Sequence, residues 1–212
     1  MLNRMKDAVD AQLRDQQAGF RKDRLSTDQI ATLQIIVEQS VEWNSSLYIN
    51  FIDYEKAFDS VDRRTLWKLF RHHGVPEKIV NIIRNSYDGL QCKVMHVGQL
   101  TDAFPVRRGV RQGCLLSPFL FLLVVNWIMK TSTSEGKHGT KWTAQNQLHD
   151  LDFADDLALL SHTHEQMQMK TASVTAVSAS VASTYTKGKP RSSNTTPRTA
   201  IQSLLMAKLW KM

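Results

Sequence analysis

Cysteine and long apolar segments are both scarce in this chain. Its 212 residues include two cysteines, Cys92 and Cys114, and neither stands in a CxxC or CxxH pair. We therefore expect reduced thiols in an intracellular protein rather than a disulfide framework or a cysteine-based zinc site. The longest apolar run, 119–129, is shorter than the roughly 20 residues of a membrane helix. The charged N-terminal segment is unlike a signal peptide, so no membrane association is expected, and nucleus and cytoplasm both stay open.

Acidic residues are outnumbered by basic ones. Lysine and arginine total 27 against 20 aspartates and glutamates, which gives a net charge of +7. A basic balance favours a polyanionic partner such as nucleic acid. An ordinary solvated surface rich in lysine is the alternative, and composition alone does not choose between them.

Apolar periodicity predicts a chain that mixes helices with strands. Spacing by three and four residues predicts helices over 26–43, 60–74, 76–89, 117–129 and 163–181. Alternation over residues 47–53 predicts a strand with Asp53 at its end, on the same face as Ile49 and Phe51. A hairpin is expected around Gly98–Gln99, and a second one carries an acidic pair at its tip. Beyond residue 185 the chain is rich in Ser, Thr, Pro and Lys, which is typical of disorder.

The carboxylates at two of these turns are the main candidates for chemistry. Asp53 ends one strand, and Asp155 and Asp156 lie where two short strands meet. If the strands are neighbours in one sheet, three carboxylates reach one edge, where like charges need cations to neutralise them. Such hard oxygen ligands suit Mg²⁺ and the phosphoryl transfer carried out by two-metal sites. The alternative for each aspartate taken alone is a helix cap or a surface turn.

Three short motifs make the chain recognisable. "FIDYEKAFDSVDR", "RRGVRQGCLLSPFLF" and "FADD", in this order and at these spacings, resemble central motifs of reverse transcriptases, most closely those of non-LTR (LINE-type) retrotransposons. The resemblance covers residues 17–190, and "QAGFRKDRLSTDQI" resembles the stretch that joins fingers to palm in that family. It implies an α+β fold, a polymerase-type palm of antiparallel strands backed by helices. The implied division is partial fingers over 1–46, palm over 47–186 and a disordered or aberrant tail over 187–212, with no thumb.

The resemblance also assigns roles by position. Asp53, Asp155 and Asp156 match the catalytic, metal-binding aspartates, which implies two Mg²⁺ ions as cofactors, with Mn²⁺ as a substitute. Phe58 matches the bulky residue that excludes a ribose 2′-hydroxyl, with plain core packing as the alternative.

Further residues are matched to substrate binding. Gln112 and Gly113 match a pair beside the incoming nucleotide. Arg108 and Arg111 are placed to contact phosphate, with solvated arginines as the alternative. Lys187 or Lys189 matches a lysine near the leaving pyrophosphate.

The function implied is RNA-directed DNA synthesis, with an RNA template, a DNA primer and dNTPs as partners. One alternative is an inactive, truncated retroelement remnant that at most binds nucleic acid. A metal-dependent nuclease would use the same carboxylates but leaves Phe58, Gln112 and Gly113 without a role.

Overall fold

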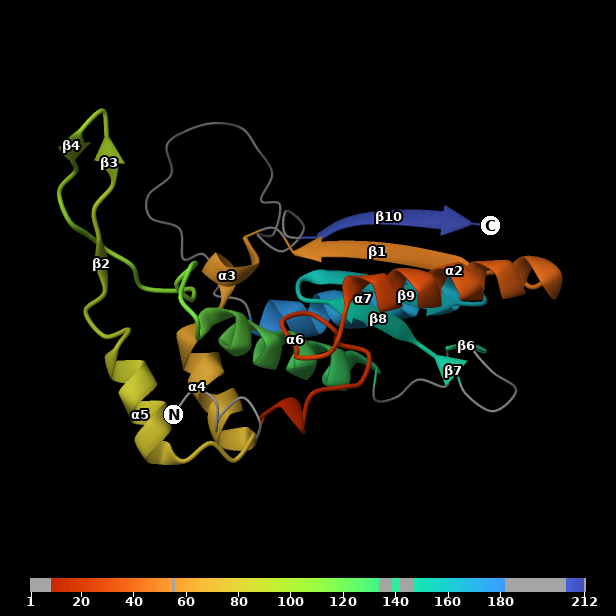
Figure 1. The fold of residues 1–212 in the computed structure, drawn as a ribbon, viewed down its shortest axis with the longest axis horizontal. Coiled ribbons are helices and arrows are strands. Elements are labelled where there is room, and N and C mark those ends of the chain that lie inside the picture. The colour runs from red at the N-terminus through yellow and green to blue at the C-terminus, as the bar shows by residue number, and fades with distance from the viewer. Residues whose placement is uncertain (1–8, 55, 134–138, 142–146, 182–204, 212) are drawn as a thin grey trace.

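The computed structural model describes residues 9–54, 56–133, 139–141, 147–181 and 205–211 (Figure 1). The helices are α2 (Ser26–Glu42), α3 (Ala57–Ser60), α4 (Arg63–His72), α5 (Glu77–Asn85), α6 (Ser117–Thr133) and α7 (His164–Val181). The strands are β1 (Tyr48–Tyr54), β2 (Gln91–Cys92), β3 (Met95–His96), β4 (Gln99–Leu100), β5 (Phe104–Pro105), β6 (Thr140–Lys141), β7 (Gln147–Leu148), β8 (Asp150–Phe153), β9 (Asp156–Ser161) and β10 (Leu205–Lys211). The predicted helices and hairpins are confirmed, with ends shifted by a few residues.

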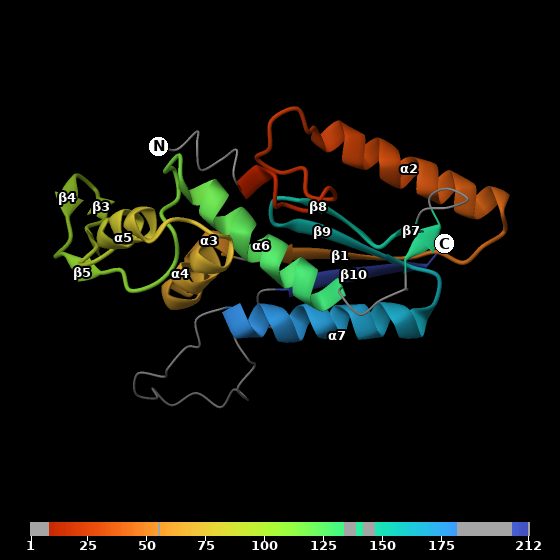
Figure 2. The same cartoon turned by 90° about the horizontal axis from the view of Figure 1, so that it is seen from below.

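The central sheet has four strands in the order β10-β1-β9-β8, and each neighbouring pair is antiparallel. Strand β1 therefore lies between two partners, with β9 on one side and β10 on the other. Figure 2 shows α2 and α7 on opposite sides of this sheet. An antiparallel sheet backed by helices confirms the predicted α+β, palm-like fold.

Side chains from the two faces of the sheet belong to two separate apolar clusters. Ile49 packs with Ile36 of α2 in the smaller cluster, whereas Ile52 packs with α6 and α7 in the larger one. This separation follows from the alternation of side chains along a strand. On the α7 face, Asn50 Nδ2 donates to Thr171 Oγ1 at 2.8 Å. Both faces are thus covered over most of the sheet.

Helix α6 lies in the centre of the larger cluster, and most of its side chains are buried. Its apolar character on nearly all sides explains this position. Over the part of the chain that the structure describes, no helix combines the length and apolar character needed to cross a membrane.

Helix α4 begins at Arg63, within three residues of the start that the sequence predicts. The Asp62 carboxylate accepts a hydrogen bond from the Thr65 backbone N–H at 2.8 Å and so caps the first turn. The helix ends at His72, just before Gly74, whose positive φ of 70° suits the turn that follows.

The segment from β2 to β5 forms a narrow ribbon that projects from the body of the molecule (Figure 1). Its turn lies at Val97–Gly98, one residue before the predicted one, and both residues have positive φ. The ribbon packs little against the body, and Val97 is 88% exposed.

The C-terminal strand differs from the prediction. Leu205–Lys211 form a strand that pairs along the whole of β1, within the region 187–212 where the sequence predicted a disordered or aberrant tail. Without β10, one edge of β1 would keep its N–H and C=O groups free to pair with another strand. The predicted division at 46/47 and 186/187 stays a prediction. Lys187 and Lys189 lie outside the described residues.

Candidate active site

Strands β1 and β9 bring two of the predicted carboxylates together. Asp53 is the register partner of Asp156, so the two residues lie directly opposite each other across the antiparallel pair. Opposite residues in such a pair have Cα atoms roughly 4.5–5.5 Å apart and share one face of the sheet. The same face carries Ile49, which α2 covers, and Phe51, which is already 40% exposed. Helix α2 therefore no longer covers this face at Asp53, and the carboxylates of Asp53 and Asp156 are exposed to solvent.

Asp155 completes the acidic group from the turn. It follows Ala154 between β8 and β9 and is half-buried. Partial burial raises the pKa of Asp156 above its ordinary value, and the charges of Asp155 and Asp53 raise it further. The part of this shift that comes from Asp155 and Asp53 is the expected effect of like charges held close together.

Two other acidic residues of the hairpin have a different environment. Asp150 and Asp152 of β8 are each 1% exposed and form ion pairs with Arg14. Burial raises the pKa of Asp152, and the Arg14 charge partly offsets that effect. The hairpin thus separates a buried, arginine-paired set of carboxylates from an exposed set that faces solvent.

The donor chemistry of the exposed set fits a hard divalent cation. All its ligand atoms are carboxylate oxygens, and their mutual repulsion is relieved by a positive ion. Among the described residues, no group of three aspartate, glutamate, histidine or cysteine side chains is arranged closely enough to hold a metal ion. The fit therefore rests on the chemistry and register of Asp53 and Asp156, with Asp155 adjacent.

A large open cavity of about 1400 Å³ lies beside α6. Phe58, Gln112 and Gly113, all predicted from the sequence to bind substrate, contribute to its wall. Arg21 and Lys22 of the N-terminal region line it as well. Among the described residues, the three aspartates do not form part of this lining.

Phe58 packs in the core and also lines the cavity. Its ring stacks on Phe121 of α6, with centroids 5.0 Å apart, and so contributes to the core. The same side chain is half-buried and faces the cavity. Core packing therefore holds the ring at the cavity wall, and the two interpretations are compatible.

Arg63, which the sequence analysis did not select, holds the loop before α6. Its guanidinium donates to the backbone oxygens of Val106, Arg108 and Gly109 at 2.8, 3.0 and 2.8 Å. The guanidinium carbon also lies 4.8 Å from the centre of the Tyr87 ring. The only signal in the sequence is an arginine at the first position of a helix, where the helix dipole disfavours a cation.

The same loop is fixed to α3 by its backbone. Val110 N–H donates to Phe58 O at 2.7 Å, and Gly109 N–H donates to Val61 O at 2.9 Å. A Cβ at Gly109 would lie 2.8 Å from Asp59 Cα, so this close approach needs glycine. The structure therefore brings the Gln112–Gly113 loop next to the Phe58 segment.

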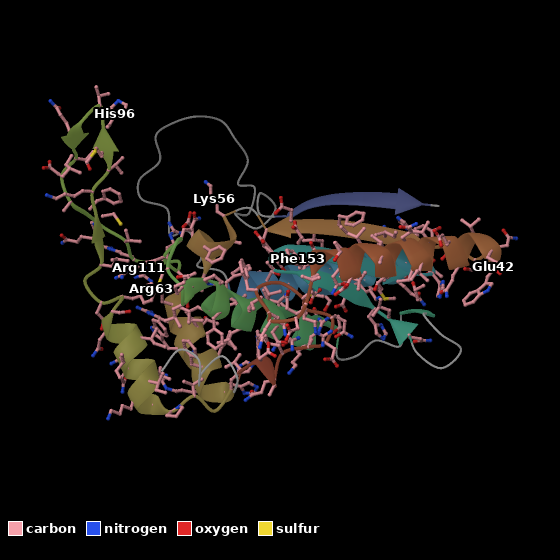
Figure 3. All side chains as sticks on the ribbon, in the orientation of Figure 1. Glu42, Lys56, Arg63, His96, Arg111 and Phe153 are labelled. Atoms are coloured by element: carbon pink, nitrogen blue, oxygen red, sulfur yellow. The ribbon has the colours of Figure 1, made fainter. Side chains whose placement is uncertain are left out.

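The predicted phosphate contacts lie at the edge of this loop. Arg108 and Arg111 are both exposed. Arg111 donates to Ser86 O and lies over Tyr87, near Arg63 in Figure 3. Arg21, in contrast, is bound to Asp10 through two hydrogen bonds of 2.7 and 3.1 Å.

Comparison with known sequences gives one consistent result. A sequence model of the family described as "Reverse transcriptase (RNA-dependent DNA polymerase)" matches residues 1–190. The chain is 32% identical over 155 residues to the Retrovirus-related Pol polyprotein from type-2 retrotransposable element R2DM of Drosophila melanogaster, covering 72% of this chain and 14% of that protein. An R2 polyprotein of Nasonia vitripennis is 34% identical over 122 residues, covering 58% of this chain and 12% of that protein.

Comparison with solved structures agrees at the level of the fold. The telomerase of Candida tropicalis, solved in complex with a fragment of telomeric RNA, superposes with a TM-score of 0.60 at 13% identity. That match covers 98% of this chain and 32% of the telomerase chain. The corresponding telomerase of Candida albicans gives a TM-score of 0.55 at 12% identity, over 89% of this chain and 34% of that one.

Proposed function

We propose that this chain extends a DNA primer along an RNA template. The chain belongs to the reverse transcriptase family and is a reverse transcriptase domain of the non-LTR retrotransposon type. The observation that carries the proposal is the register of Asp53 opposite Asp156 at the uncovered end of the sheet. The chain spans 14% of the Drosophila relative, so activity and substrates are proposed for this segment on its own residues.

The reaction joins a primer 3′-oxygen to the α-phosphorus of a dNTP and breaks the bond to pyrophosphate. Reverse transcriptases in general use divalent metal ions, and Asp53, Asp155 and Asp156 are the residues that would hold them here. Two Mg²⁺ ions, or Mn²⁺ in their place, would supply the positive charge that activates the attacking hydroxyl and neutralises the leaving group. The part of the protein is to hold the carboxylates in fixed positions at the ends of β1 and β9 and in the turn before β9.

Phe58 and the loop before α6 are proposed to shape the nucleotide site. Phe58, held by Phe121, presents a rigid ring at the cavity wall, and such a ring would exclude a ribose 2′-hydroxyl. Gln112 and Gly113 line the same cavity, where a residue without a side chain permits close approach of a base. Replacing Phe58 by Val is expected to raise ribonucleotide incorporation relative to deoxynucleotide incorporation.

Nucleic acid binding is proposed to depend mainly on charge. The chain carries a net charge of +7, and Arg108 and Arg111 are exposed in the loop before α6. Contacts of this kind to phosphates release counterions, so affinity is expected to fall steeply with salt. Lys187 or Lys189 is proposed to lie near the leaving pyrophosphate.

The test is primer extension on an RNA template with a DNA primer, dNTPs and Mg²⁺. The chain is compared with Asp155→Ala/Asp156→Ala, and with Asp15→Asn, which changes an exposed carboxylate, as the control. Extension by the chain and the control but not by the double variant supports the proposal. Duplex binding without extension by any of them would favour an inactive remnant. Release of nucleotides from the primer end without extension would favour a nuclease.

A further inference from the structure

Gln17 lies against the turn that carries the acidic pair. Its side chain is buried, with 1% of the residue exposed, and its amide contacts the backbone of Ala154. Ala154 directly precedes Asp155 and has a positive φ of 58°. For a residue with a Cβ, this left-handed conformation is sterically unfavourable. Something in the fold must therefore hold the turn in it.

The Gln17 amide binds both polar backbone groups of that one residue. Ala154 N–H donates to Gln17 Oε1 at 2.9 Å, and Gln17 Nε2 donates to Ala154 O at 3.4 Å. Gly19 N–H donates to the same Oε1 at 2.7 Å. Only a side chain with a donor and an acceptor at this reach satisfies all three groups: glutamate offers acceptors alone, and methionine offers no donor.

Backbone contacts on either side of Gln17 also hold its segment against the end of β8. Ala18 N–H donates to Asp152 O at 2.9 Å, and Asp152 N–H donates to Gln16 O at 3.2 Å. A Cβ added at Gly19 would lie 2.1 Å from the nitrogen of Ala154. The segment from Gln16 to Gly19 is thus pressed against the end of β8 along its length.

We propose that Gln17 is a positioning residue for the acidic pair. By fixing the N–H and the C=O of Ala154, its carboxamide sets the direction in which the chain leaves the turn. That direction determines where the carboxylates of Asp155 and Asp156 lie relative to Asp53. The Gln17 side chain acts through the backbone of Ala154, since its hydrogen bonds are to Ala154 and Gly19 and not to the three aspartates. The inference rests on the proposed function, because it assigns those carboxylates a common task.

The test compares Gln17→Met with Gln12→Met in the full chain. Methionine nearly conserves the volume of glutamine and removes its amide. Gln12 serves as the control because its Nε2 also donates to a backbone oxygen, that of His73 at 3.1 Å, on another part of the fold. A third variant adds Ala154→Gly to Gln17→Met, because glycine adopts a positive φ without cost. If Gln17 acts through the conformation of Ala154, this addition restores part of the loss.

The first readout does not require polymerisation. Mn²⁺ is titrated into isotope-labelled chain, and paramagnetic broadening of the Asp53 and Asp156 amide signals is followed. Gln17→Met is expected to raise the Mn²⁺ concentration for half-maximal broadening about 10-fold, and Gln12→Met to leave it unchanged. Adding Ala154→Gly should recover part of the shift. An unchanged Mn²⁺ midpoint in Gln17→Met, with only a lower unfolding temperature, would overturn the proposal.

The second readout is single-nucleotide extension below the unfolding temperature of every variant. Misplaced catalytic groups predict that kcat falls about 10- to 100-fold while KM for the dNTP stays within a factor of two. A loss confined to KM would contradict a positioning role. If even the unmodified chain does not extend primers, the proposed function fails, and the Mn²⁺ titration still decides the role of Gln17.

Discussion

Asp53 and Asp156 occupy one register position on adjoining strands, and each contributes an exposed carboxylate to the same face of the sheet. Like charges placed opposite each other in a sheet destabilise it by roughly 0.2–1 kcal/mol. The palm therefore carries an unfavourable contact, which binding of a divalent cation would relieve.

Removing one of these charges should stabilise the free protein. Asp53→Asn is expected to raise the free energy of unfolding in EDTA by roughly 0.2–1 kcal/mol, because Asp156 loses its facing charge. Addition of Mg²⁺ should then stabilise the unmodified chain more than the variant. Urea unfolding with and without Mg²⁺ measures both effects. Equal stabilisation of the two proteins by Mg²⁺ would contradict the assignment of Asp53 as a cation ligand.

Loss of the Arg63 guanidinium should loosen the loop before α6. Three backbone oxygens lose a charged donor in Arg63→Met, and hydrogen bonds to charged groups contribute about 1.5–3 kcal/mol each at most. We expect a loss of stability of about 1–3 kcal/mol in total and faster amide exchange over residues 106–113. Arg64→Met, at an exposed neighbouring position, is the control. Amide exchange at 106–113 that matches this control would show that Arg63 does not hold the loop.

Buried Lys170 should make stability depend on pH in the alkaline range. Burial lowers its pKa to about 8 from the ordinary 10.5, while Nζ donates to the carbonyls of Leu160 and His149. Between these two pH values the unfolded chain binds more protons than the folded one, so the free energy of unfolding rises with pH. A shift of this size corresponds to roughly 3–3.5 kcal/mol over the full window.

The comparison is between the unmodified chain and Lys170→Met, unfolded in urea at pH 7.5 and at pH 9.5. The unmodified chain should gain stability relative to the variant as the pH rises. The window stops below pH 10 because burial also raises the pKa of Tyr54 to about 12, which opposes the gain above its ordinary value of 10. Parallel pH profiles of the two proteins would show that folding does not lower the pKa of Lys170.

The contact between Gly19 and Ala154 predicts a steric cost. In Gly19→Ala the new methyl group would meet the Ala154 backbone, which cannot rotate out of the way. Overpacking of this kind typically costs about 1–3 kcal/mol. Gly89→Ala is the comparison, because φ at Gly89 is +67° and nothing lies within 4 Å of the added carbon. There only backbone strain of about 1 kcal/mol is expected.

Thermal unfolding of both glycine variants measures the difference. The larger loss should belong to Gly19→Ala. A loss no greater than that of Gly89→Ala would show that the N-terminal segment does not press on the turn.

Local signals predicted most elements of this fold. The alternation over residues 47–53 placed Asp53 at the end of a strand, and the helical spacing over 60–74 placed α4 to within a few residues. Both depend on neighbours a few residues away. The composition of 187–200 led to the expectation of disorder as far as residue 212, although Leu205–Lys211 join the sheet. Pairing with β1, far away in the sequence, outweighs that local signal.

The site needed contacts that no local pattern contains. The sequence predicted three carboxylates near one edge, but the register of Asp53 with Asp156 is fixed by strands about a hundred residues apart. Gln17 and Arg63 escaped notice for the same reason, since each acts on the backbone of a distant turn. Glutamine and arginine are ordinary surface residues, and only burial against Ala154 or Gly109 distinguishes these two.

Single-nucleotide incorporation tests the central claim most directly. A DNA primer on an RNA template is mixed with one complementary dNTP and Mg²⁺, and Asp53→Asn is compared with Asp15→Asn. The account predicts rapid addition by the unmodified chain and by Asp15→Asn, and a loss of about a thousandfold or more in Asp53→Asn, as for a group that stabilises the transition state. Equal rates in the two variants would contradict the assignment of Asp53 and its partner Asp156 as the catalytic pair.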